Sequence, residues 1–141
     1  MDKLPARLHA GWAHAAGDGR ETVGALPLLP DEDACNATIA RHIRALAARG
    51  PLRILEAGCG QRWFIDLDGL AYTLVGVDLD PAALDIRLHQ RADLHEATVG
   101  DLCTVELPAS SFDVIYSSFV LEHVDQADVV LENFARWLKP G

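Results

Sequence analysis

Two glycines and a carboxylate in the middle of the chain have the spacing of a nucleotide-binding site. The apolar residues 54–55 lead through an acid to Gly58 and Gly60, which predicts a buried strand that ends in a tight turn. A second apolar run, residues 74–77, ends in Asp78, 18 residues after Gly60. A glycine turn offers backbone N–H groups to a ligand, and an acid after the next strand can accept both hydroxyls of a ribose.

Asp78 and a second acid, Asp101, each have a simpler interpretation. An aspartate after a strand often only caps the next helix, but Asp80 fits that task, so the spacing leaves Asp78 free to face a ligand. Asp101 follows a third predicted strand and is either a turn acid or an acceptor for an exocyclic amine such as that of adenine. Leu79 and Leu102 could cover the two faces of a base.

The segment after the fourth predicted strand adds two serines and a histidine. Ser117 and Ser118 would lie beside the glycine turn if the first and fourth strands are neighbours. His123 is a candidate general base, because the pKa of histidine lies near neutrality. The alternative is that Glu122 and His123 only begin a helix, and we favour that alternative.

The elements that position these residues alternate between strands and helices. Strands are predicted over 53–57, 73–77, 96–99 and 112–117. Helices are predicted from residue 32 to the stop at residues 50–51, over 61–71, from 81 to about 91 and over 126–138, with Asp31, Asp80 and Asp125 as N-caps. Strands separated by helices predict a parallel sheet with right-handed crossovers.

Composition and charge narrow the classes of function. The chain has 141 residues, 50% of them hydrophobic, enough for one domain with a core. Its net charge of −9, without a basic stripe, disfavours nucleic acid as a partner. The three cysteines, Cys35, Cys59 and Cys103, and the histidines show no metal-ligand spacing, which favours free thiols and no metal. No apolar run approaches the roughly 18 residues that span a bilayer, and no signal peptide is evident, so we expect a cytoplasmic protein without a membrane partner.

The ordered set of motifs resembles the class I S-adenosylmethionine-dependent methyltransferases, in particular their small-molecule methyltransferase-domain branch. Residues 54–60 resemble the first motif of that family, residues 75–80 its ribose-binding strand and residues 100–101 its adenine-side acid. Its later motifs resemble residues 107–117, 120–124 and 138–141. Each motif alone is weak, but the ordered set is specific, and it covers about residues 40–141.

The resemblance implies a Rossmann-like, doubly wound α/β sheet and S-adenosylmethionine as cofactor. It places the methionine part of the cofactor at Gly58, Cys59 and Gly60, its amino group near Glu56, the ribose at Asp78 and the adenine at Asp101 and Leu102. A cofactor that carries a sulfonium and an ammonium suits acidic residues. Because its methyl group is already activated, holding a small-molecule acceptor in line can suffice, and a base can be dispensable.

Two departures from the family pattern shape our expectations. Arg62 stands where the family usually has another glycine, and the chain ends at residues 139–141, the turn that leads into a fifth strand in the family. We therefore expect a truncated sheet of order 3-2-1-4, without the last three strands. Its fourth strand would be a bare edge through which the chain could form a homodimer. Residues 31–141 would form a partial cofactor-binding domain, and residues 1–30 a possible lid.

Two other functions remain open on the sequence. A dinucleotide-dependent oxidoreductase would need a third glycine at the position of Trp63, where a bulky residue blocks close strand–helix packing around a pyrophosphate. A non-catalytic module could keep the fold and bind the cofactor or a partner chain without turnover. Product formation distinguishes this module from a methyltransferase, and cofactor preference distinguishes a methyltransferase from the oxidoreductase.

Overall fold

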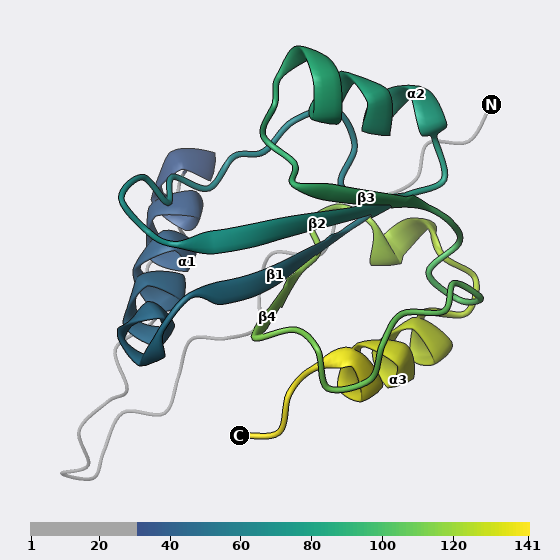
Figure 1. The fold of residues 1–141 in the computed structure, drawn as a ribbon. Helices are drawn as coiled ribbons and strands as arrows, with labels where there is room; N and C mark the ends of the chain where they lie inside the picture. Colours follow the sequence, from purple (N-terminus) through teal and green to yellow (C-terminus); the bar gives the residue numbers. More distant parts are fainter. Residues whose placement is uncertain (1–30) are drawn as a thin grey trace, which may run out of the picture. The chain divides into compact units, whose positions relative to one another are not determined.

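A computed structural model describes residues 31–141, in which four parallel strands form a sheet of order β3-β2-β1-β4 (Figure 1). The strands are β1 (Leu52–Ala57), β2 (Tyr72–Asp78), β3 (Glu96–Val99) and β4 (Val114–Tyr116). The helical segments are α1 (Glu32–Leu46), η1 (Ala47–Arg49), α2 (Pro81–Asp85), η2 (Ile86–Gln90), η3 (Leu121–His123) and α3 (Ala127–Trp137). The predicted parallel sheet and its strand order are confirmed. The predicted lid lies outside the described residues, and no helix within 31–141 is both long and apolar enough to cross a membrane.

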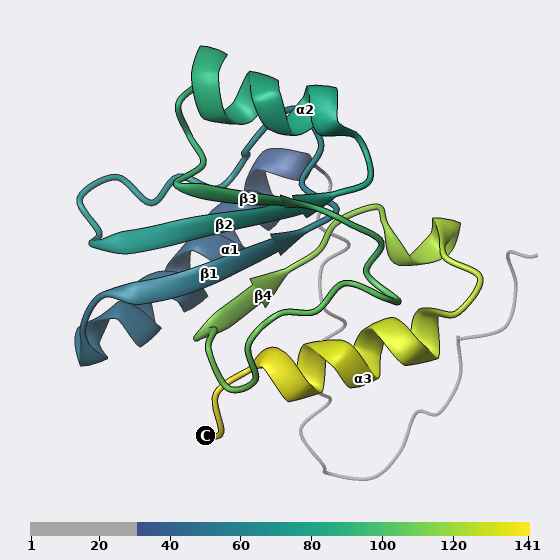
Figure 2. The ribbon, with the colours of Figure 1, turned by 45° about the vertical axis from the view of Figure 1, so that its right-hand side comes forward.

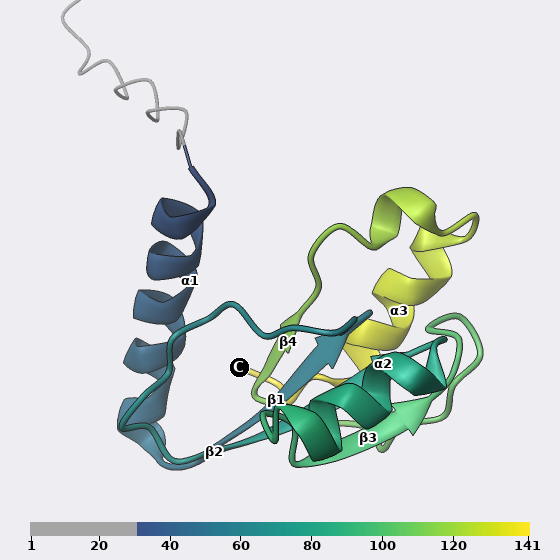
Figure 3. The same ribbon diagram turned by 90° about the horizontal axis from the view of Figure 1, so that it is seen from above.

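Helices cover both faces of the sheet, because neighbouring strand residues point to opposite sides. Ile54 of β1 packs in a core cluster with residues of α1 and α2, whereas Leu55 packs in a second cluster with residues of α3. Both side chains are fully buried. Figure 2 shows the strand order from the side, and Figure 3 shows α1 and α3 on opposite sides of the strands. This three-layer packing explains why most positions of β1 and β2 are buried.

The predicted helix over 61–71 is wrong, since this segment between β1 and β2 is an extended loop. Arg44 of α1 donates to the backbone carbonyl of Asp66 at 3.1 Å and to a second carbonyl two residues later. These carbonyls are thus bound by a side chain from elsewhere in the chain. Ile65 and Leu67 are both buried, and a two-residue spacing of buried side chains is typical of extended backbone.

Aspartates begin two of the helices as predicted. Asp31 and Asp80 each accept a hydrogen bond from a backbone N–H two or three residues on, at 2.7 and 2.9 Å. The helix after Asp80 continues past α2 as the π-helical segment η2. The predicted cap of the last helix is wrong, because Gln126 rather than Asp125 takes the N-cap position of α3 and makes no side-chain cap bond.

The chain after α3 pairs with the residues just before β4, on the outer edge of the sheet. Phe112 forms a parallel bridge with Leu138, and the N–H of Lys139 donates to the Phe112 carbonyl at 2.9 Å. The chain that leaves α3 therefore returns alongside the residues just before β4. The bare edge that we predicted is limited to the three residues of β4, and a homodimer through it stays a prediction.

Candidate functional site

The glycine turn follows β1 at the carboxyl edge of the sheet. Gly58 and Gly60 have φ angles of 71° and 51°, in the left-handed region that favours glycine. The backbone N–H groups of Gly58 and Cys59 both donate to the Val77 carbonyl, at 2.8 and 3.1 Å. A Cβ atom on Gly58 would lie 2.3 Å from Cγ2 of Val120, so this position also needs glycine for space.

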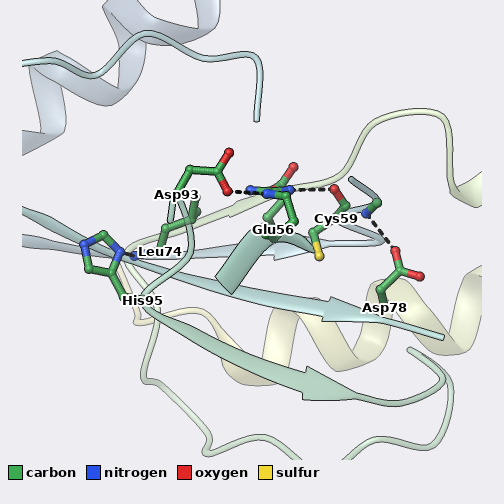
Figure 4. A network of polar contacts seen from close by, with 8 residues as sticks. Glu56, Cys59, Leu74, Asp78, Asp93 and His95 are labelled. Atoms are coloured by element: carbon green, nitrogen blue, oxygen red, sulfur yellow. Dashed lines mark hydrogen bonds and ion pairs between the residues drawn. The ribbon is translucent and has the colours of Figure 1, made fainter. Parts of the chain in front are cut away.

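Asp78, at the end of β2, holds the turn from the other side. Its Oδ2 accepts the N–H of Gly60 at 2.8 Å (Figure 4). Its Oδ1 accepts the N–H of Asp80 at 2.9 Å. Asp80 rather than Asp78 caps the next helix, as predicted, and the two backbone bonds hold the Asp78 carboxylate in place. Each carboxylate oxygen has two lone pairs, so a ligand hydroxyl can still donate to this group.

Two cavities lie along this edge, and they share Gly58 and Phe119 as lining residues. The first, which we call the turn cavity, has a volume of about 240 Å³. Of the predicted site residues it is lined by Glu56, Gly58, Cys59, Gly60 and Ser118. The second, the acid cavity, has a volume of about 300 Å³. Of the predicted residues it is lined by Gly58, Asp78, Leu79, Asp101, Leu102 and His123.

Three predicted residues differ in detail from the expected arrangement. Ser117 lines neither cavity, and its hydroxyl donates to the Ala57 carbonyl at 3.0 Å. Asp101 accepts the N–H of Cys103 at 2.8 Å, as a turn acid does, and also lines the acid cavity. His123 ends the short helix η3 rather than beginning a helix as we expected, and its exposed side chain lines the same cavity.

Sequence reasoning missed a buried arginine beneath the turn. Arg87 has no exposed surface and pairs with Glu56, whose own exposure is 4%. Burial raises the pKa of Glu56 to about 7, although the hydrogen bond from Arg87 acts in the opposite direction. The sequence does contain a signal for this burial, namely helical spacing. Arg87 comes three residues after Leu84 and therefore lies on the inward face of the helix that begins at Pro81.

The cysteine of the turn contributes structure rather than reactivity. The side chain of Cys59 is 3% exposed and belongs to the core cluster under α1 and α2. Burial raises the pKa of its thiol to about 12, so the thiolate that a nucleophile requires does not form at neutral pH.

The chemistry of the lining residues favours a ligand that donates hydrogen bonds or carries positive charge. Glu32 and Glu56 provide two carboxylates in the turn cavity, which Arg62 also lines, and Asp78 and Asp101 provide two in the acid cavity. Amines, hydroxyls and cationic centres are suitable partners for these carboxylates. A phosphate or pyrophosphate would meet like charge from Asp78, which is bound to the same turn.

Comparison with known proteins agrees with this arrangement. A family model described as a methyltransferase domain matches residues 55–141. The ubiquinone biosynthesis O-methyltransferase of Bradyrhizobium diazoefficiens is 34% identical over 116 residues, which cover 77% of this chain and 44% of that protein. Phosphoethanolamine N-methyltransferase 1 of Arabidopsis thaliana is 32% identical over 94 residues, which cover 63% of this chain and 19% of that protein.

Solved structures show the same fold. The S-adenosylmethionine dependent methyltransferase from Mesorhizobium loti superposes with a TM-score of 0.58 at 31% identity, covering 70% of this chain and 49% of that one. This chain spans from about a fifth to less than half of the length of these curated relatives. The match extends over the whole sheet edge that carries both cavities, from β1 to the end of the chain. The chain belongs to the methyltransferase-domain family of the class I S-adenosylmethionine-dependent methyltransferases.

Proposed function

We propose that this chain binds S-adenosylmethionine across its two cavities and transfers the methyl group to a small-molecule acceptor. The observation that carries this proposal is the pair of adjoining cavities, which meet at Gly58 and hold carboxylates at separate places. The cofactor has the matching pattern, with an adenosine diol at one end and an ammonium group at the other.

The acid cavity is the proposed place of the adenosine. Asp78 accepts the ribose hydroxyls, and its bonds to the N–H groups of Gly60 and Asp80 hold it in position. Asp101 accepts the exocyclic amine of adenine, while Leu79 and Leu102 lie against the base. Leu79 is 70% exposed in this structure, so a bound base would cover apolar surface that now faces water.

The turn cavity is the proposed place of the amino-acid part. Glu56 faces the ammonium group, and the backbone of Gly58, Cys59 and Gly60 follows the methionine chain closely. A Cβ on Gly60 would meet no atom within 4 Å, so open space adjoins the turn on this side. Ser118 lines the same cavity.

The proposed chemistry requires little from the side chains beyond positioning. The cofactor supplies a methyl group that is activated by the adjacent sulfonium. A lone pair of the acceptor forms the new bond to the methyl carbon, the electrons of the carbon–sulfur bond go to sulfur, and the acceptor proton leaves to solvent. His123 lines the acid cavity and is the candidate to take that proton where the acceptor needs a base.

A small acceptor is favoured over a nucleic acid. The net charge of −9 is unfavourable for a phosphate backbone. Two related enzymes, by their names, methylate phosphoethanolamine and an intermediate of ubiquinone biosynthesis. The three free cysteines support a reducing compartment such as the cytoplasm.

Calorimetric titration of S-adenosylmethionine tests the proposal. We expect saturable binding to the wild-type chain, binding at least about tenfold weaker in Asp78→Ala, and no binding of NAD. Asp85→Ala is the matched control, because Asp85 is an exposed aspartate of the next helix that lines neither cavity. Absence of binding to the wild type would refute the proposal, and binding without methyl transfer to any small acceptor would favour a non-catalytic module.

A further inference from the structure

A fully buried guanidinium lies beneath the glycine turn and has no part in the function proposed so far. Arg87 donates from Nη2 to Oε2 of Glu56 at 2.8 Å, from Nη1 to the Cys59 carbonyl at 2.7 Å and from Nε to Oδ1 of Asp93 at 2.5 Å. Figure 4 shows the three partners, Asp93, Glu56 and Cys59, side by side. Burying a guanidinium is costly unless it is paired and hydrogen-bonded, and here every nitrogen of the group has a partner.

The helix that carries Arg87 has an unusual geometry at this place. The segment Ile86–Gln90 is π-helical, and the N–H of Arg91 donates to the Ile86 carbonyl, five residues back, at 2.9 Å. Insertions of this kind widen a helix by one residue and often occur at functional sites. The wide turn contains Arg87, whose side chain reaches the Cys59 carbonyl in the loop after β1.

The bond to the Cys59 carbonyl fixes the turn from below. The N–H of Cys59 donates to the Val77 carbonyl at 3.1 Å, and the N–H of Gly60 donates to Asp78 at 2.8 Å. Strand β2 therefore holds the N–H groups of the turn, while Arg87 holds the carbonyl between them. The direction of the peptide between Cys59 and Gly60 depends on both sets of bonds.

The bond from Arg87 makes the two oxygens of the Glu56 carboxylate different from each other. Oε2 accepts from Arg87, whereas Oε1 takes part in no hydrogen bond among residues 31–141. Glu56 lines the turn cavity, so the second oxygen is the one available to a ligand. Asp93 provides a second carboxylate on Arg87, so the three groups together keep one negative charge when all are ionised.

We infer that Arg87 is a positioning residue that presents Glu56 and the glycine turn to the amino-acid end of the cofactor. This inference rests on the proposed function, because it assigns that end of the cofactor to the turn cavity. Arg87 itself touches neither cavity. Its action is indirect, through the orientation of one carboxylate and one carbonyl.

Two probe ligands distinguish this role from general support of the fold. S-adenosylhomocysteine carries the amino-acid group, and 5′-methylthioadenosine lacks it, while both contain the same adenosine. In Arg87→Met we expect the affinity for S-adenosylhomocysteine to fall at least about tenfold and the affinity for 5′-methylthioadenosine to stay within about twofold. Arg53→Met is the matched control, since Arg53 lies on the same strand as Glu56 but pairs with Glu96 at 2.6 Å outside both cavities.

The pH profile provides a second measurement for the case in which Arg87→Met does not fold. Besides burial, Arg87 lowers the pKa of Glu56, whereas Asp93 and Asp78 raise it. The other charged residues that line its cavity are Glu32 and Arg62. Removing the charge in Asp93→Asn therefore lowers the pKa of Glu56. We expect the rise of S-adenosylhomocysteine affinity with pH to move to lower pH in this variant, with no such shift for 5′-methylthioadenosine.

The outcomes distinguish a failure of the Arg87 inference from a failure of the proposed function. Equal loss of both probes in a folded Arg87→Met, or an unmoved pH profile in Asp93→Asn, would overturn the inference and leave the proposed function standing. If the wild-type chain binds neither probe, the proposed function itself is wrong, and the role of Arg87 is refuted with it. Selective loss of S-adenosylhomocysteine supports both.

Discussion

Replacing Gly58 by alanine should cost more stability than the same change at Gly60, and the structure gives the difference. Both residues have positive φ angles, so each variant bears a backbone cost of about 1–2 kcal/mol. In both variants the unfolded chain is less flexible, so the entropy lost on folding falls by a similar amount. These two contributions nearly cancel when the variants are compared, which leaves the space around each new Cβ atom as the main difference.

That space differs sharply between the two positions. A Cβ on Gly58 would lie 2.3, 2.9 and 3.2 Å from Cγ2, Cγ1 and Cβ of Val120, whereas a Cβ on Gly60 would meet nothing within 4 Å. Rotation of the valine side chain cannot remove the contact with its own Cβ, and branching at Cβ restricts the rotamers of valine. Overpacking of this kind costs about 1–3 kcal/mol, so Gly58→Ala should be less stable than Gly60→Ala by that amount.

Urea unfolding followed by far-ultraviolet circular dichroism measures the difference, with free energies obtained by linear extrapolation. Adding Val120→Ala to Gly58→Ala should recover most of the extra loss, because it removes both Cγ atoms that crowd the new Cβ. Two results would refute the reasoning: equal stability of the two glycine variants within about 0.5 kcal/mol, or no recovery in the double variant. In either case the crowding at Val120 would not be what keeps glycine at this position.

Three further predictions concern single elements. Asp31→Ala should lower the free energy of unfolding by about 1 kcal/mol in urea titrations, because the bond to the Ala34 N–H at 2.7 Å is lost, and an unchanged midpoint would contradict this. Trp137→Ala should cost about 3–5 kcal/mol by the same measurement, because the side chain is fully buried, and a loss below about 1 kcal/mol would argue against that packing. Stability should fall as pH rises from about 4.5 to about 7, because burial raises the pKa of Glu56 to about 7 and the native state then holds a proton that the unfolded state has released. The slope should be up to about 1.4 kcal/mol per pH unit and weaker in Glu56→Gln; an equal slope in that variant would assign the effect to other groups.

The strands and their order could be predicted because their signals are local and mutually consistent. The run at residues 73–77 and the strand at Glu96–Val99 are bounded by turn residues, and the structure extends the first only to Tyr72–Asp78. The carboxyl edge of a parallel sheet then brings Gly58 and Asp78 together with no further information. This reasoning placed all but one of the predicted site residues beside a cavity, the exception being Ser117.

Two of the errors involve a partner that is distant in the sequence. The segment 61–71 has helical spacing of apolar residues, but Arg44, more than 20 positions away, binds its carbonyls instead. Arg87 was missed for the same reason, since its partners Glu56 and Cys59 lie 31 and 28 positions earlier. Such pairings leave only a weak trace in the sequence, namely a charged residue on the inward face of a helix.

The central position of β1 has a consequence for local opening. Backbone bonds hold β1 to β2 on one side and to β4 on the other, whereas β3 pairs with β2 alone among the described residues. Amide hydrogens of Leu52–Ala57 should therefore exchange with solvent only through global unfolding, while those of Glu96–Val99 exchange through smaller, more frequent openings. The turn at Gly58 follows the central strand β1, whereas Asp101 follows the edge strand β3. We therefore expect the Asp101 end of the proposed ligand site to open more often than the end at the glycine turn.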